Sequence, residues 1–221
     1  MLAFQLLGAL ASAALVSSVP LVARTCDTSD AVMDLPSGQT ALVSPTTAPL
    51  YVLLGVGIQN YSCSSTTSTY TSIGAVASLF DISCLIDSSD FASIQTTAFD
   101  IWNAAPSGTA ASSIGSQVSA PDLLGFHYFV TSPSGTGISP EWDFTSTTGD
   151  SSSYVIGAKV GDIAAPTDSA TNVDWLALNS AQGSLASKIF RIDTVKGQPP
   201  TSCVAGSDPI SVKYTAKYYL Y

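Results

Sequence analysis

Short apolar segments separated by turn residues recur along nearly the whole chain after residue 38. Each segment is rich in Val, Ile, Tyr or Phe and is bounded by Gly, Pro, Ser or Asp, which is typical of strands between turns. We expect strands over Thr40–Val43, Tyr51–Gln59, Ile73–Phe80, Gly125–Thr131, Tyr154–Val160, Asp174–Leu178, Lys188–Thr194 and Ser211–Tyr221. Because helical patterns do not intervene, the sequence predicts an all-β fold: a single antiparallel β-sandwich or barrel-like domain with long loops rich in Ser, Thr and Gly.

The C-terminal segment has the clearest strand pattern. Its alternating positions form two sets, which are Val212, Tyr214, Ala216, Tyr218 and Leu220 against Lys213, Thr215, Lys217, Tyr219 and Tyr221. A period of two with lysines in one set predicts a half-buried antiparallel strand.

Helical patterns are few, and the fold is expected to contain at most one or two short helices. Ser89–Trp102 is one candidate, with Asp90 as a possible N-terminal cap. A Thr-Thr pair and β-branched residues disfavour a helix there, so a helical and a non-helical structure are both open.

The N-terminal segment predicts export. Residues 1–23 carry no charged side chain, and Leu6–Val16 is an apolar run. At about eleven residues this run fits a signal peptide and is shorter than the ~20 residues of a membrane-spanning helix. We expect a signal peptide over residues 1–23, with cleavage between Ser18 and Ala23; a buried N-terminal element is the alternative. No later stretch approaches the length of a membrane span.

The cysteines agree with an extracellular location. All four cysteines follow the predicted signal peptide. An even number of cysteines in an exported chain indicates disulfides, and four cysteines can pair in three ways. Residues 24–38 are polar and are expected to form a tail tied by Cys26, followed by a single β domain over residues 39–221. Asn60-Tyr61-Ser62 is an acceptor sequence for N-glycosylation at Asn60.

Charge and composition exclude several function classes. Seven Lys and Arg against 16 Asp and Glu give a net charge of −9, and there is no basic run, so nucleic acid is not an expected partner. One His rules out a site with several histidine ligands, and neither C-x-x-C nor the D-x-D-x-D-G calcium loop occurs. We therefore expect no metal and no cofactor.

Several segments together indicate a family. In chain order they are Leu54–Cys63, Gly74–Asp81, Gly125–Phe129, Pro140–Trp142, Asp174–Leu178, Phe190–Thr194, Gly197–Cys203 and Val212–Tyr221. Over roughly residues 35–221 the chain resembles a secreted family of fungi and bacteria catalogued as domain of unknown function 3455, and it looks like the fungal branch. The resemblance to the family's shared cysteine positions implies a Cys63–Cys203 disulfide, which leaves Cys26–Cys84 as the second pair.

Members of that family are often labelled malate dehydrogenase, but this sequence does not support the label. A dinucleotide-binding turn needs G-x-G-x-x-G between a strand and a helix. Gly55-Val56-Gly57 is followed by Ile58-Gln59-Asn60, without a third glycine or a helical pattern. We interpret these glycines as closely packed residues within a strand.

Candidate site residues lie in two of the family segments. His127 is the only histidine and Glu141 the only glutamate, so a catalytic site would use His127 as a general base with Glu141 or Asp143 as its partner. Trp142 and Tyr128 are ligand-binding candidates. The alternative places His127 on a strand, hydrogen-bonded to a neighbour, with Trp142 in the core.

Three functions remain open from sequence. The first is a secreted extracellular or cell-wall-associated β domain that binds polysaccharide through aromatic side chains, and it is motivated by the low charge and by aromatic-bearing strands. The aromatic candidates are Trp142, Trp175, Tyr214, Tyr218, Tyr219 and Tyr221, which otherwise are core residues. The second is a hydrolase-like extracellular enzyme using His127, Glu141 and Asp143. The third is a secreted protein that interacts with a host or partner protein.

Overall fold

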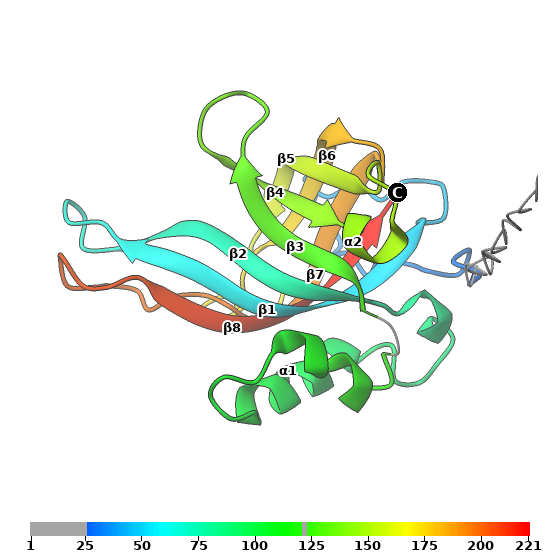
Figure 1. Cartoon of the computed structure of the whole chain (residues 1–221), viewed down its shortest axis with the longest axis horizontal. Helices are drawn as coiled ribbons and strands as arrows, with labels where there is room; N and C mark the ends of the chain where they lie inside the picture. Colours follow the sequence, from blue (N-terminus) through cyan, green and yellow to red (C-terminus); the bar gives the residue numbers. More distant parts are fainter. Residues whose placement is uncertain (1–25, 121–122) are drawn as a thin grey trace, which may run out of the picture.

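The strand-forming segments pair in sequence order until the last returns to the first, which closes a barrel. A computed structural model describes residues 26–120 and 123–221, so the predicted signal peptide lies outside the described residues. The eight strands are β1 (Tyr51–Cys63), β2 (Tyr70–Asp81), β3 (Leu123–Thr131), β4 (Ile138–Asp143), β5 (Tyr154–Ile163), β6 (Trp175–Gly183), β7 (Lys188–Lys196) and β8 (Ile210–Leu220). Neighbours are antiparallel, and β8 pairs with β1. The all-β prediction is confirmed, and the domain is a closed barrel (Figure 1).

Helices are short and lie outside the barrel. The α-helices are α1 (Ile94–Ala104) and α2 (Thr145–Thr148), and the 3₁₀ turns are η1 (Ser83–Leu85), η2 (Ala111–Ser113) and η3 (Gly115–Gln117). The candidate helix at Ser89–Trp102 therefore exists, but it begins later, after Ser93. Helix α1 packs on the outer side of β1, β7 and β8 (Figure 1).

Two hydrophobic cores result from this arrangement. The inner core fills the barrel with residues from strands all around it, among them Leu53, Trp142, Leu178 and Tyr218. The outer core lies between the barrel, α1 and the N-terminal segment. Strand β1 serves both cores, because the side chains of successive strand residues point to opposite faces.

The glycines of β1 allow close packing inside the barrel. A Cβ atom on Gly55 would lie 2.5 Å from the Tyr218 ring, and one on Gly57 would lie 2.0 Å from the Val76 carbonyl oxygen. Both glycines are in the middle of a strand that pairs on both sides. They are therefore packing residues, and the interpretation of this motif as part of a strand is confirmed.

The strand expected at Thr40–Val43 is absent, and that prediction is wrong. The Gln39 side chain pairs with the backbone of Leu42 instead, donating from Nε2 to its oxygen and accepting from its nitrogen, both at 2.8 Å. This local pairing satisfies backbone groups that a ladder would otherwise use. Leu42 is still buried, in the outer core.

Strand β4 was missed by the sequence analysis because it contains Pro140, which lacks a backbone donor. Pro140 pairs with Phe129 on β3, whereas β4 pairs with β5 only over Glu141–Asp143. The proline therefore occupies a stretch with one neighbour, which matches the confinement of proline to the edges of sheets.

The C-terminal strand is buried on both faces, which corrects the expectation of a half-buried strand. Helix α1 covers the face that carries the lysines. Thr215 Oγ1 donates to the Gln95 carbonyl at 2.7 Å, and Lys213 Nζ donates to the Trp102 carbonyl at 2.6 Å. The barrel interior buries one face of β8 and α1 buries the other, so strand periodicity alone could not reveal the burial of both faces.

Both disulfides implied by the family resemblance are present. Cys63–Cys203 joins the end of β1 to the segment that follows β7, and Cys26–Cys84 joins the N-terminal segment to η1. The second bond ties down the N-terminal segment, whose residues Asp34 and Pro36 line the site described below.

Candidate functional site

His127 lies inside the barrel, on β3. Its ring stacks on the Trp142 indole with 4.7 Å between the ring centroids, and its Nδ1 is 2.9 Å from the Glu141 carbonyl oxygen. Burial lowers the pKa of His127 to about 4, so the ring is neutral at pH 7. A carbonyl can only accept a hydrogen bond, so Nδ1 carries the proton and donates it.

The two candidate carboxylates lie on the other face of the sheet. Glu141 and Asp143 flank Trp142 on β4, so their side chains point away from the interior that holds His127. On that outer face the Tyr128 hydroxyl donates to Asp143 Oδ2 at 2.7 Å. Burial, and then the charge of Asp143, raise the pKa of Glu141. The structure thus brings Tyr128, Glu141 and Asp143 together but separates them from His127.

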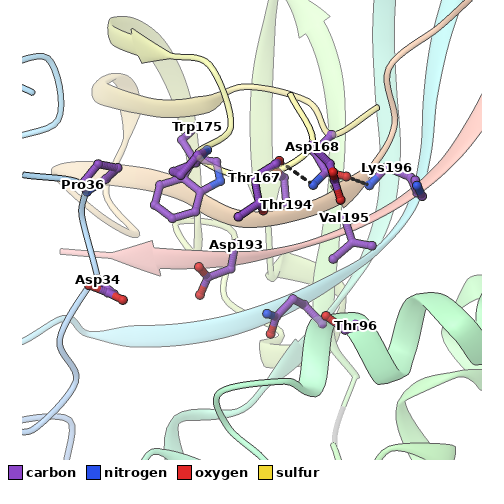
Figure 2. A pocket seen from close by; sticks show the side chains of 13 residues that line it. Asp34, Pro36, Thr96, Thr167, Asp168, Trp175, Asp193, Thr194, Val195 and Lys196 are labelled. Carbon is purple, nitrogen blue, oxygen red and sulfur yellow. Dashed lines mark hydrogen bonds between the residues drawn. The ribbon is translucent and has the colours of Figure 1, made fainter. Parts of the chain in front are cut away.

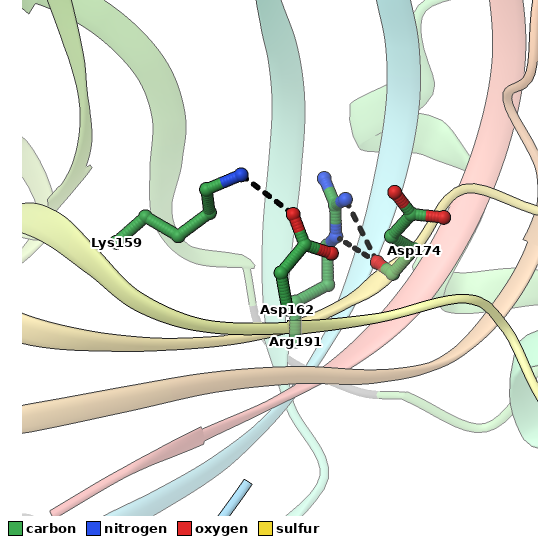
Figure 3. Close-up of polar contacts among 4 residues, drawn as sticks. All are labelled: Lys159, Asp162, Asp174 and Arg191. Carbon is green, nitrogen blue, oxygen red and sulfur yellow. Dashed lines mark hydrogen bonds and ion pairs between the residues drawn. The ribbon is translucent and has the colours of Figure 1, made fainter. Parts of the chain in front are cut away.

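A second polar cluster lies beside β5 and β6 (Figure 3). Lys159 Nζ and Asp162 Oδ2 form an ion pair at 2.5 Å, and Arg191 donates from Nε and Nη2 to the Asp174 carbonyl oxygen at 3.1 and 2.8 Å. Burial, and then the charge of Asp162, raise the pKa of Asp174. Two cations balance two carboxylates, so the cluster needs no external charge. Within residues 26–120 and 123–221, no group of three or more His, Cys, Asp or Glu side chains is arranged to hold a metal ion.

The candidate site is a hollow of about 510 Å³ on the outer side of the barrel, referred to below as the first hollow. Its walls come from the N-terminal segment, α1, the β5–β6 loop and β7. The lining residues are Asp34, Pro36, Gln95, Thr96, Pro166, Thr167, Asp168, Asn172, Trp175, Asp193, Thr194, Val195 and Lys196. Figure 2 shows side chains from these segments surrounding one space. The volume falls in the range of sites for small ligands.

A bulge in β7 shapes one side of the first hollow. The pairing with β8 shifts between Ile192 and Val195, so Asp193 and Thr194 oppose the single residue Ala216. Asp193 has a φ of +50°, a left-handed conformation that costs energy for a residue other than glycine. A bulge of this kind redirects the side chains of its strand, and Asp193 lines the hollow as a result.

Asp193 is held in place by a buried lysine. Lys217 Nζ lies 3.0 Å from Asp193 Oδ2 and 4.5 Å from the centre of the Phe91 ring, and the Lys217 side chain is only 3% exposed. This pair uses one carboxylate oxygen of Asp193. The other oxygen, Oδ1, makes no hydrogen bond to the described residues and can accept one from a ligand.

Gln95 lines the same hollow, and its side chain contains an acceptor that has no partner in the described part of the chain and is shielded from the hollow itself. Its side chain is nine-tenths buried, and its Nε2 donates to the Ala92 carbonyl at 3.1 Å. Its Oε1 has no hydrogen-bond partner among the described residues. A buried polar atom left without a partner costs about 1–3 kcal/mol, so a rotation of Gln95 that turns Oε1 toward a donor in the hollow would recover that energy.

The loop opposite Gln95 is fixed by its own hydrogen bonds. Asn172 donates from Nδ2 to the Thr167 carbonyl at 2.9 Å and accepts from the Lys196 backbone nitrogen at 2.7 Å. Asn172 therefore ties the β5–β6 loop to the end of β7. The hollow is rigid on this side before any ligand arrives.

Most of the segments that form the first hollow belong to a known protein family. A family model described as protein of unknown function DUF3455 matches residues 44–221. The chain belongs to this family. Neither a curated protein nor a solved structure was found to match it. Gln95, Trp175 and Asp193 lie within the part of the chain that the DUF3455 model covers, whereas Asp34 and Pro36 precede it.

Sequence reasoning found only part of this site. Trp175 was considered as a surface aromatic residue, but Gln95 and Asp193 were not singled out for function. The family segments Asp174–Leu178 and Phe190–Thr194 contain Trp175 and Asp193, so those segments held a usable signal. Gln95 gave none, because a glutamine in a helix is ordinary until its oxygen is found unpaired.

Proposed function

We propose that this DUF3455 protein is a secreted protein that binds a saccharide in the first hollow. The observation that carries the proposal is the lining of this hollow, which combines the Trp175 indole with polar side chains that include Gln95 and Asp193. Extracellular location is supported by two disulfides and by the uncharged N-terminal segment. In the described part of the chain, no helix has the length and hydrophobicity to cross a membrane.

The lining matches the chemistry of a sugar ring. A sugar presents C–H groups on its ring face, which pack on an apolar aromatic surface such as the Trp175 indole. Its hydroxyl groups can donate to Asp193 Oδ1, and to Gln95 Oε1 once the Gln95 side chain turns its oxygen into the hollow. Three carboxylates line the hollow, those of Asp34, Asp168 and Asp193, against the cations of Lys196 in the lining and of Lys217, which is paired with Asp193. This charge favours a neutral, hydroxyl-rich ligand over a polyanion.

Binding is proposed rather than hydrolysis because the expected catalytic group does not assemble. His127 lies within the barrel, and the Glu141 and Asp143 side chains lie on the opposite face of the sheet. A general base must reach the proton that it removes, directly or through one water molecule. A ligand held by Trp175 would not meet His127.

Retention on insoluble polysaccharides tests the proposal. The protein is incubated with chitin, β-glucan and cellulose, and we expect retention on at least one of them. Trp175→Ala should abolish retention, and Gln95→Met, which keeps the size but removes the acceptor, should weaken it about tenfold, the effect of one lost hydrogen bond. Tyr128→Phe is the matched control outside the hollow and should bind normally.

Two results would overturn saccharide binding. One is the absence of retention on all three polymers. The other is retention that neither Trp175→Ala nor Gln95→Met changes while circular dichroism shows that both variants are folded.

Secretion needs a separate experiment. The full chain is expressed in a eukaryotic secretory host, and the protein from the medium is sequenced from its N-terminus. We expect a mature chain that begins between Val19 and Arg24, and a shift in mass on enzymatic deglycosylation that Asn60→Gln removes. Retention inside the cell with residues 1–23 intact would contradict export.

A further inference from the structure

A second hollow of about 450 Å³ adjoins the first. Its lining residues are Phe99, Asn103, Thr171, Lys196, Gly197, Gln198, Ser211, Val212 and Lys213. Lys196 lines both hollows. Helix α1 also borders both, with Thr96 at the first and Asn103 at the second.

The two hollows share aromatic and polar lining residues but differ in charge, because Lys196 and Lys213 and no carboxylate of the described residues line the second, whereas three carboxylates line the first. Each has one aromatic ring in its lining, Trp175 in the first and Phe99 in the second. Each also has carboxamides and hydroxyls, which in the second hollow come from Asn103, Gln198 and Ser211, among others. A repeated lining of this kind suits a ligand whose units repeat.

The ridge between the hollows is rigid. Asn172 and Gly197 form an isolated β-bridge, Gln198 donates from its backbone nitrogen to the Thr171 carbonyl at 3.1 Å, and Val173 donates to the Lys196 carbonyl at 3.0 Å. Lys196 at this ridge has a φ of +60°. Its Nζ lies 3.3 Å from Thr171 Oγ1, so its side chain rests on the ridge. A ridge fixed in this way limits the ordering that binding would otherwise require.

We propose that the two hollows form one groove along α1 that binds an extended, neutral oligosaccharide chain, with consecutive sugar units in the first and second hollows. This inference rests on the proposed saccharide binding. The stretch of α1 from Thr96 to Asn103 spans about 10 Å at 1.5 Å per residue, which exceeds the length of a single sugar ring. The groove therefore selects for chain length, which a single hollow would not do.

Titration calorimetry with oligosaccharides of defined length tests the groove. The probes are soluble chito-, cello- and β-1,3-gluco-oligosaccharides of two, four and six units. In the series that binds, we expect the affinity to rise at least tenfold from two to six units. Asn103→Ala and Gln198→Ala should each weaken binding of the six-unit chain severalfold and leave the two-unit chain unchanged. Gln95→Met should weaken both chains.

Asn179→Ala is the matched control, because Asn179 is an exposed amide on β6 that lines neither hollow. It should not change the affinity for either chain. Equal affinity for two and six units, with loss only in Gln95→Met, would overturn the groove and leave saccharide binding in the first hollow intact. If none of the oligosaccharides and none of the insoluble polymers binds, both proposals fail together.

Discussion

The inside of the barrel and the outer side of β7 are built from the same strands but packed differently. Inside, His127, Trp142 and Tyr218 contact one another, with ring centroids 4.7–5.6 Å apart, and fill the centre. Outside, a bulge and a covering helix leave a hollow of about 510 Å³, which is lined in part by Gln95 and Asp193. Eight strands enclose an interior that side chains can fill, so the space for a ligand lies where other segments meet the barrel wall.

The comparison also explains why the aromatic residues differ in their roles. Trp142 is almost fully buried and stacks on a neutral histidine, whereas Trp175, although it is also largely buried, lines the hollow. Removal of Trp142 should therefore affect stability alone, whereas removal of Trp175, which also belongs to the outer core, should affect both stability and binding.

The largest expected effect is on the inner core. Trp142→Ala should lower the free energy of unfolding by about 3–5 kcal/mol, because it leaves a cavity between His127 and Tyr218. Urea unfolding followed by circular dichroism measures this loss. Trp142→Phe, which keeps an aromatic ring, should cost less. A loss below about 1 kcal/mol would mean that the interior is no better packed than the hollow.

The next effect concerns the buried ion pair beside the hollow. Asp193→Asn should cost about 3 kcal/mol, because the Lys217 charge would remain buried without its partner. Asparagine has nearly the same size and tolerates the left-handed backbone conformation at this position. Urea unfolding reports the loss, and Lys217→Met added to Asp193→Asn should recover much of it. Without such recovery, the ion pair would not be the cause.

Acid should destabilise the interior through His127. Its pKa is about 4 in the folded protein and about 6.5 when unfolded. The unfolded chain therefore takes up the proton first as the pH falls. Stability is full above pH 6.5 and falls by about 3 kcal/mol as the pH approaches 4. Unfolding curves of the wild type and of His127→Gln across this range provide the measurement.

The difference in pH dependence of stability between the wild type and His127→Gln isolates the contribution of the histidine. The raised pKa values of Glu141 and Asp174 and the lowered pKa of Asp143 are common to both proteins. A parallel pH dependence in the two proteins would show that His127 is protonated without cost and is therefore accessible to water.

The smallest effect is expected at the exposed ion pair. The Lys159 and Asp162 side chains are 56% and 37% exposed, so Asp162→Asn should change the free energy of unfolding by less than about 1 kcal/mol. The same change should lower the pKa of Asp174, because the charge of Asp162 helps to raise it. Carboxyl NMR titration measures that shift. A stability loss as large as that of Asp193→Asn would remove the distinction between the two pairs.

Much of the fold could be predicted from local patterns. Alternating residues identified β8, and β-branched and aromatic runs located six of the other strands. The two errors in locating strands had local causes, which the strand propensities of the residues do not take into account. The Gln39 side chain replaced a ladder at Leu42, and Pro140 fitted a stretch of β4 with one neighbour.

The candidate site was much harder to predict. His127, Glu141 and Asp143 are close in sequence and lie on adjacent strands, yet the alternation of side chains places the histidine inside and the carboxylates outside. Conversely, Gln95 and Asp193 line one hollow although they are far apart in the sequence. Neither residue belongs to a motif that would have linked them.

The sequence by itself determined the β class, the family and the cysteines available for two disulfides, because these depend on composition, on residue spacing and on motifs in order along the chain. Tertiary structure alone decided that the sheet closes, that α1 covers β8 and that Asp193, at a bulge, lines the same hollow as Gln95. Closure and docking depend on contacts between distant segments. A hollow is the space that these segments leave unfilled when they pack together, so no local sequence pattern predicts it.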